Sequence, residues 1–83
     1  MNQLFNLIQE LKETILNQPH VDGCLISLET LDDYGFCLQV TIQMDDMERV
    51  GITKKIDRRH NPIFMRLLFN DVRDACLRAL EGV

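Results

Sequence analysis

The sequence predicts a two-layer α+β domain in the order α-β-β-β-α, with both helices on one face of a three-stranded antiparallel sheet. Three observations lead to this fold. Apolar residues recur at three- and four-residue steps near both ends of the chain, which is typical of amphipathic helices. In the middle the apolar period changes to two, which is typical of strands. The 83 residues suffice for a single domain over 1–83 with one small core.

The first helix is expected over residues 3–17. Pro19 should end it, because proline has no amide hydrogen to donate and disfavours a helical conformation in the residue before it. The apolar stripe that should face the sheet consists of Leu4, Leu7, Ile8, Leu11 and Ile15.

The first two strands form a hairpin whose register can be checked in the sequence. Folding the chain about Asp33 sets three apolar residues of one strand opposite three of the other, so no slip of register is needed. The pairs are Cys24 with Ile42, Ile26 with Val40, and Leu28 with Leu38. Cys37 then falls on the polar face of the sheet, where we expect an accessible thiol.

A weaker third strand runs through Val50, Ile52 and Ile56. Lys54 interrupts its apolar face, which suits an edge strand, because a charge there discourages pairing with another sheet.

The last helix is expected from Asn61-Pro62 to Leu80 or Glu81. An asparagine cap followed by proline favours a helix start, and Gly82 suits a left-handed stop. Its predicted apolar arc comprises Phe64, Met65, Leu68, Phe69, Val72, Ala75, Cys76, Ala79 and Leu80.

The charge is unevenly divided. Residues 1–48 carry nine acids and one base, which gives −8, and residues 49–83 carry four acids and eight bases, which gives +4, for a net −4. The odd number of cysteines and their spacing predict free thiols in a cytoplasmic protein, with no metal and no cofactor. The apolar runs are shorter than the ~18 residues of a membrane span, so no membrane association is expected.

Three surfaces are candidates for binding. A basic segment before the last helix should attract an anion or an acidic partner, aided by the helix dipole. Acidic residues of the two turns are explained most simply by turn formation, or else they form an acidic partner-binding surface that imitates nucleic-acid phosphates. Leucines and an isoleucine on the polar side of the last helix form a predicted oligomer interface. These sets are, in order: Lys54, Lys55, Arg58, Arg59 and His60; Asp32, Asp33, Asp45, Asp46 and Glu48; Ile63, Leu67 and Leu77.

We find no catalytic residue, because neither His20 nor His60 has an identifiable nucleophile or third group beside it in the pattern. The predicted function is therefore a small non-enzymatic protein-interaction module whose partner is another protein, with a homodimer as a second association. Its concrete form is a viral protein, from a phage or mobile element, that inhibits a nucleic-acid-processing host protein through the acidic surface.

The alternative is nucleic-acid binding. The helix–strand–strand–strand–helix order resembles that of double-stranded-RNA-binding domains, and a basic segment precedes the last helix in both. The resemblance implies phosphate contacts from Lys54-Lys55 and Arg58-Arg59, which only approximate the lysine-rich motif of that family. The negative net charge argues against binding of a polyanion, because such affinity rests on neutralising phosphates.

Overall fold

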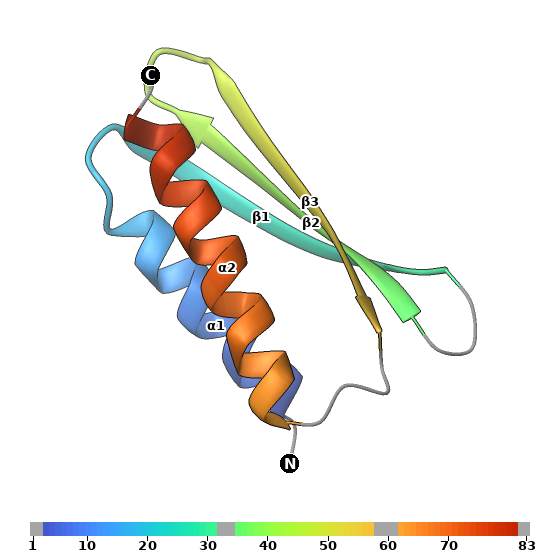
Figure 1. The fold of residues 1–83 in the computed structure, drawn as a ribbon. Coiled ribbons are helices and arrows are strands. Elements are labelled where there is room, and N and C mark those ends of the chain that lie inside the picture. Colours follow the sequence, from blue (N-terminus) through green and yellow to red (C-terminus); the bar gives the residue numbers. More distant parts are fainter. Residues whose placement is uncertain (1–2, 32–34, 58–61, 82–83) are drawn as a thin grey trace.

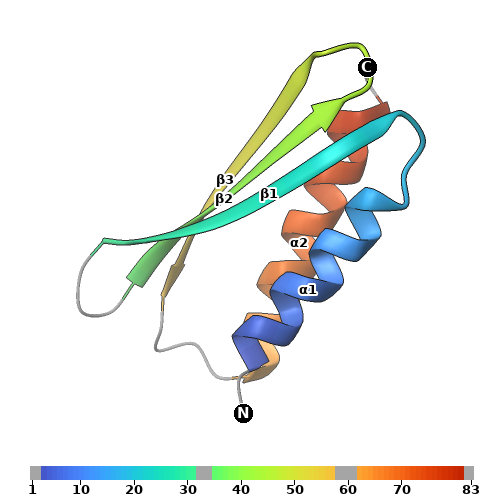
Figure 2. The ribbon, with the colours of Figure 1, turned by 180° about the vertical axis from the view of Figure 1, so that it is seen from behind.

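The computed structural model describes residues 3–31, 35–57 and 62–81. They form α1 (Gln3–Leu16), β1 (Val21–Thr30), β2 (Gly35–Met44), β3 (Arg49–Asp57) and α2 (Pro62–Glu81). The two helices lie side by side on one face of the sheet (Figures 1 and 2), where α1 contacts β1 and α2 contacts β3. The predicted two-layer α+β fold is confirmed. The predicted helix cap, Asn61, and stop, Gly82, lie outside the described residues.

The sheet has the strand order β1-β2-β3 with antiparallel pairs, and the predicted hairpin register is confirmed. Ile26 lies opposite Val40, and Leu28 lies opposite Leu38. A bulge between Val21 and Gly23 is the one irregularity in this pairing of the described strands. On the edge strand β3, Lys54 lies opposite Leu38 and is half-buried, as an inward-pointing charge on an edge strand should be.

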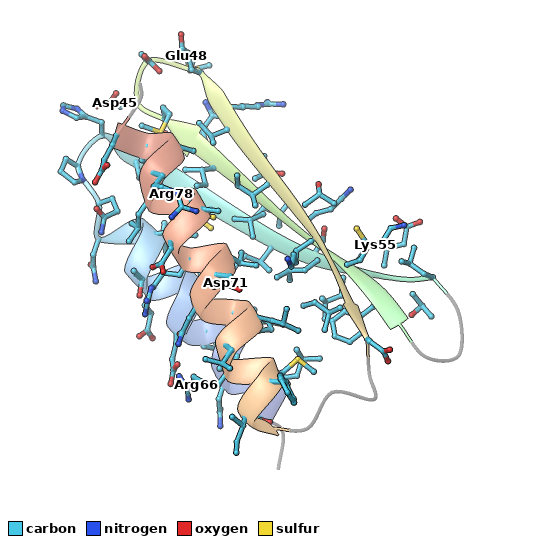
Figure 3. All side chains as sticks on the ribbon, viewed as in Figure 1. Asp45, Glu48, Lys55, Arg66, Asp71 and Arg78 are labelled. Carbon is cyan, nitrogen blue, oxygen red and sulfur yellow. The ribbon has the colours of Figure 1, made fainter. Side chains whose placement is uncertain are left out.

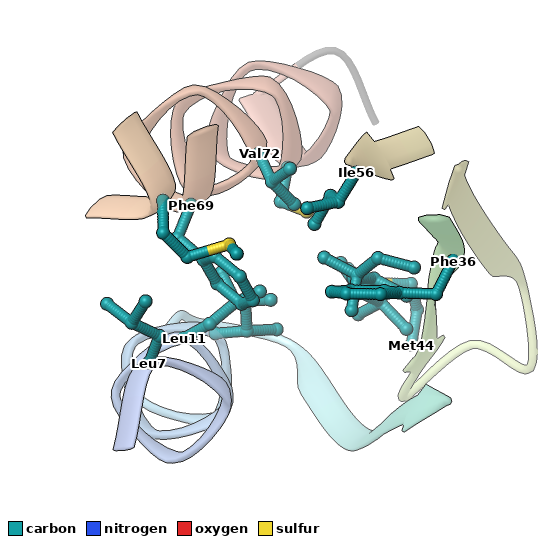
Figure 4. Close-up of a cluster of buried hydrophobic side chains, with 13 residues drawn as sticks. Leu7, Leu11, Phe36, Met44, Ile56, Phe69 and Val72 are labelled. Carbon is teal, nitrogen blue, oxygen red and sulfur yellow. The ribbon is translucent and has the colours of Figure 1, made fainter. Parts of the chain in front are cut away.

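The core lies between the sheet and the two helices (Figure 4). Leu7, Leu11 and Ile15 of α1 are buried there at four-residue steps, as the periodicity predicts. β2 is the central strand and is buried more completely than its neighbours, because both helices and both edge strands surround its apolar side. Full burial of each large apolar side chain contributes roughly 1.5–3 kcal/mol.

The first helix ends at Leu16, one residue before the predicted end. The amide of Gln18 donates to the Ile15 carbonyl at 3.0 Å, and its side chain donates to the Thr14 carbonyl at 3.2 Å. His20 then adopts a left-handed backbone conformation with φ 67°, which turns the chain from α1 into β1.

The helical layer and the sheet diverge towards the end where both helices begin (Figures 1 and 2). The radius of gyration is accordingly 12.9 Å, against about 11.8 Å for a compact chain of this length. One prediction fails here. The periodicity predicts Phe64 in the apolar arc of the last helix, but its side chain is largely exposed, because the first turn of α2 lies where the layers have moved apart.

Candidate interaction surfaces

An acidic group occupies the turn between β2 and β3. Asp45, Asp46 and Glu48 are all exposed there, and Figure 3 shows Asp45 and Glu48 at this end of the molecule. The turn is held by hydrogen bonds. The Glu48 amide donates to Asp46 Oδ1 at 3.0 Å, and the Met44 amide donates to the Glu48 carbonyl at 2.8 Å. The carboxylates are therefore presented on a fixed backbone.

The connection between α1 and β1 braces the same turn. The Asp45 amide donates to the His20 carbonyl at 2.9 Å, and His20 Nδ1 lies 3.0 Å from Asp45 Oδ2. Met47 supplies the turn's left-handed residue, with φ 75°. These contacts tie together two loops that are 25 residues apart in sequence.

Two further acids belong to this end and were missed by the sequence reasoning. Asp22 is exposed at the start of β1, next to the Val21–Met44 pair that precedes the turn. Glu81 is exposed at the end of α2, which reaches the same end of the molecule (Figure 1). The acidic end is defined here as Asp22, Asp45, Asp46, Glu48 and Glu81. Asp22 could have been found by extending the predicted hairpin register two residues beyond the pair of Cys24 and Ile42.

The other predicted acids, Asp32 and Asp33, lie outside the described residues. The strand ends that flank them, Thr30 and Gly35, lie at the opposite end of β2 from Asp45. A meander places its two successive turns at opposite ends of the sheet, so the described part of the predicted acidic surface is the β2–β3 turn alone.

The basic segment is only partly described. Lys54 points to the helix side of the sheet and Lys55 to the open face, because neighbouring residues of a strand alternate between faces. Arg58, Arg59 and His60 lie outside the described residues. The two described lysines therefore do not form one basic surface.

The open sheet face corrects the prediction for Cys37. The side chain is on this face, as the register requires, but it is buried. Its register neighbours are Glu29 on β1 and Lys55 on β3, whose long side chains flank the short thiol.

The predicted oligomer interface on α2 is split. Ile63 and Leu67 are exposed and one helical turn apart. Leu77 is half-buried and lies ten residues, about 15 Å of helix rise, beyond Leu67. Whether any of these residues contacts a second copy stays a prediction.

The outer groove between the helices is small and is lined by both polar and apolar side chains. Its cavity measures about 70 Å³, and Arg66 Nη1 donates across it to Glu10 Oε2 at 2.6 Å. Arg73 also borders it and pairs with Asp74 at 3.0 Å. Each of these arginines therefore has an acidic partner within the domain.

A larger, apolar cavity of about 430 Å³ opens at the end where the layers diverge. It is lined by Leu4 of α1, Leu28 and Thr30 of β1, Phe36 of β2 and Met65 of α2. Phe36 and Met65 are buried and belong to the core, so the cavity is an extension of the core towards solvent.

Several exposed apolar side chains belong to the segments at this end of the molecule. Leu28 lines the cavity, and Phe5, Ile63 and Phe64 belong to the first turns of the two helices. Leu31 follows Thr30, so the alternation of faces along a strand places it on the open side of the sheet. We call this set the apolar end: Phe5 (54% exposed), Leu28 (40%), Leu31 (50%), Ile63 (72%) and Phe64 (55%). The sequence analysis did not predict the apolar end, because the periodicity of a single helix or strand does not show where the two layers diverge.

Cys24, Cys37 and Cys76 are free thiols. Burial raises the pKa of the Cys76 thiol to about 11, and the nearby Cys24 adds to this shift. Burial also raises the pKa of Cys24, against the opposing effect of Lys12. These electrostatic effects require that Cys24 of β1 lie close to Lys12 of α1 and to Cys76 of α2.

Within residues 3–31, 35–57 and 62–81, no three His, Cys, Asp or Glu side chains are grouped closely enough to hold a metal ion. Neither helix in these ranges is long and apolar enough to cross a membrane. Comparisons of the chain with protein-family models, with curated proteins and with solved structures found no match.

Proposed function

We propose that this chain is a non-enzymatic protein-interaction module that binds a basic surface of a partner protein through its acidic end. One observation carries the proposal: the carboxylates of Asp45, Asp46 and Glu48 are exposed together on a turn whose backbone is fixed by hydrogen bonds. Binding loses less conformational entropy when the charged groups are already held in place.

The charge around the turn supports the same direction. Asp22 and Glu81 add two exposed carboxylates, and the carboxyl end of α2 adds the negative end of its dipole, against the single positive charge of Arg78 in the last turn of α2. Arg49 lies nearby, but its Nε donates to Gln43 Oε1 at 3.0 Å. A concentration of one sign of charge speeds encounter with a partner of the opposite sign.

In its concrete form the partner is a nucleic-acid-processing protein, and the acidic end occupies the groove that otherwise holds phosphates. An inhibitor carried by a phage or mobile element would act in this way in the cytoplasm of its host. Nucleic acid and this chain would then compete for one basic surface. Competition with nucleic acid therefore distinguishes an inhibitor that occupies a phosphate-binding groove from a protein that binds basic surfaces non-specifically.

The test compares two variants of equal charge. The first is the triple variant Asp45→Asn, Asp46→Asn and Glu48→Gln, in which the amide oxygen introduced by Asp46→Asn preserves an acceptor for the turn. The matched control is Glu13→Gln, Glu29→Gln and Asp71→Asn, which neutralises three exposed acids elsewhere. Both change the net charge from −4 to −1.

Each variant is immobilised and exposed to host lysate, and captured proteins are eluted with duplex DNA. We expect wild type and the control to capture the same DNA-eluted protein and the acidic-end variant to lose it. Equal capture by both variants would contradict the role of the acidic end. Capture that duplex DNA does not release would contradict the concrete form. Thermal unfolding of both variants excludes misfolding as the cause.

Binding of duplex RNA is the second candidate, and the observation that favours it is the layout of two helices on one face of a three-stranded antiparallel sheet. The described lysines of the basic segment, however, lie on opposite faces of β3. A gel shift with duplex RNA at about 150 mM salt decides between the candidates, since non-specific affinity survives such salt only when many phosphates are neutralised. A retarded band would favour this second function.

A further inference from the structure

We propose that the outer edge of β1 is a strand-addition site, at which an extended segment of a partner protein pairs with the backbone of β1. The segment carries apolar side chains at alternate positions and one acidic side chain. The inference does not rest on the proposed function, because it concerns backbone groups and not the carboxylates of the acidic end. Its support is the unpaired backbone of β1, the contrast with the other edge of the sheet, and the flank of α1.

The pairing of β1 with β2 determines which backbone groups of β1 point outwards. The Leu31 amide donates to the Gly35 carbonyl at 3.2 Å, in continuation of the β1–β2 register. Successive residues of an antiparallel strand direct their amides and carbonyls to opposite edges. Residues of β1 at even steps from Leu31 therefore bond to β2, and the residues between them direct these groups away from the sheet. The outward-directed residues include Cys24, Ile26 and Leu28.

The outward backbone groups have no partner in the described part of the chain. No described residue bonds to the outward amides or carbonyls of Cys24, Ile26 and Leu28. Their side chains are not fully covered either, since Cys24 and Ile26 are half-buried and Leu28 is exposed. A row of unpaired donors and acceptors along an edge strand is a template for a further strand.

The two edges of the sheet differ in how they resist such pairing. On β3 the inward-pointing Lys54 protects the edge, because an incoming strand would have to bury its charge. The inward-pointing residues of β1 from Cys24 to Leu28 are all uncharged, and this stretch contains no proline. The bulge between Val21 and Gly23 precedes it. β1 is therefore the less protected edge.

The helix above β1 provides a surface for the side chains of an added strand. α1 packs on β1 (Figure 2), and its side towards α2 carries Glu10, which pairs with Arg66. Ile8 and Lys12 each lie two residues from Glu10, about 200° around the helix, so they are on the flank away from α2. Both are half-buried. The inward side chains of an added strand would contact this flank, which favours apolar residues at alternate positions.

Lys12 adds a preference for one acidic side chain. It lies close enough to Cys24 to oppose the rise in the pKa of that thiol. It forms no ion pair with a described residue. A carboxylate on the added strand beside Cys24 would pair with Lys12, and partial burial strengthens such an attraction.

A second copy of the chain fits this edge poorly. Antiparallel pairing of two β1 strands about a twofold axis would place both α1 helices on the same face of the joint sheet. Adjacent strands are about 4.8 Å apart, whereas packed helices need about 8–10 Å between their axes. Because α1 packs on β1 itself, the two helices would collide. A single extended segment has no such helix, so it is the favoured occupant.

The probe for this site is a display library of random peptides about ten residues long, selected against the full chain. Selected peptides should alternate apolar and polar residues, include an acidic residue, and bind with a dissociation constant below about 100 μM. Amide hydrogen exchange locates the bound peptide. The amides of Ile26 and Leu28 should exchange rapidly in the free protein and at least about tenfold more slowly with peptide, whereas that of Ser27 should be protected in both.

Two variants of equal charge test the edge itself. Leu28→Lys gives β1 the inward charge that β3 already has, and it should weaken peptide binding at least about tenfold. The matched control Leu25→Lys places the same charge on the open sheet face, where Leu25 is exposed, and should change binding less than about threefold. Selection against Lys12→Gln should yield peptides without the preference for an acidic residue.

Three results would overturn the inference. One is a library that yields no peptide below about 100 μM. Another is a peptide that leaves the exchange of Ile26 and Leu28 unchanged, and the last is equal weakening by Leu28→Lys and Leu25→Lys. If Leu28→Lys fails to fold by circular dichroism, the exchange of the wild type with and without peptide decides. The acidic-end triple variant should bind the same peptides as the wild type, so the proposed function is judged separately.

Discussion

Two leucines that face each other across the sheet provide a sharp test of the divergent layers. Leu28 and Leu38 are register partners on β1 and β2, with side chains on the same helix-facing side. A uniformly packed two-layer domain would bury them alike. Here Leu38 is fully buried while Leu28 is 40% exposed at the mouth of the cavity. We therefore expect Leu38→Ala and Leu28→Ala to have very different costs.

The magnitudes follow from burial and from the cavity that each substitution leaves. Leu38→Ala loses the full transfer free energy and leaves an enclosed hole, which costs about 3 kcal/mol. Leu28→Ala loses only part of the transfer free energy. It enlarges a space already open to solvent, so its cost is about 1 kcal/mol. The expected difference is about 2 kcal/mol.

Urea unfolding followed by circular dichroism measures both costs. With an m-value on the order of 1 kcal/mol per molar, the two midpoints should differ by about 2 M. The protein should be at about 2 μM, so that self-association does not contribute to stability. Equal midpoints for the two variants would refute the divergence of the layers, and a costlier Leu28→Ala would do so even more strongly.

Three further predictions concern single residues. Met47→Gly should stabilise the domain by roughly 0.5–1 kcal/mol in urea unfolding, because it relieves the left-handed conformation at φ 75°; destabilisation would contradict the turn geometry. Because its pKa is raised to about 11, Cys76 in the native protein should react with iodoacetamide at pH 8 about 100-fold more slowly than a thiol of pKa 9.0. The pKa of Cys76 is higher in the folded state than in the unfolded state, so its contribution to the stability of the domain is complete below pH 9 and is lost between pH 9 and about 11. Rapid labelling of Cys76 at pH 8 would contradict the raised pKa. Arg66→Ala should cost less than about 1 kcal/mol, since its ion pair with Glu10 is half exposed; a loss above about 2 kcal/mol would show a structural role that the geometry does not give it.

The sequence predicted the hairpin best, because two independent patterns had to agree there. The alternation on β1 and the alternation on β2 match in only one register that pairs apolar with apolar residues, so Ile26 opposite Val40 could be read directly. The helices followed from periodicity and from Pro19 and Pro62, which constrain where helices end and begin.

Features that depend on tertiary arrangement could not be read in this way. A helical wheel assigns Phe64 to the core arc, but it cannot tell where along α2 the sheet ceases to cover the helix. Likewise, the register places Cys37 on the open face, yet burial there depends on the side chains of Glu29 and Lys55 across the sheet. The apolar end exists only because four elements meet at one cavity, so no single segment signals it.

The acidic residues show what the hairpin register adds to a grouping by residue type. Five acids were grouped because both turns are acidic, although successive turns of a meander lie at opposite ends of the sheet. The hairpin register brings Asp22 to the turn that carries Asp45 and Asp46, whereas Asp32 and Asp33 lie outside the described residues. Residue type alone therefore predicts an acidic surface, and the strand register is needed to predict which acids lie together.

The affinity for the captured partner tests the central claim most directly, namely that the acidic end binds a basic protein surface. Isothermal titration of wild type, the acidic-end triple variant and the equally charged control against that partner gives three dissociation constants. Loss of three contacting carboxylates should weaken binding at least about 30-fold, or 2 kcal/mol, while the control should stay within about twofold. Equal weakening in both variants would show that net charge alone is sensed, and it would contradict a specific site at Asp45, Asp46 and Glu48.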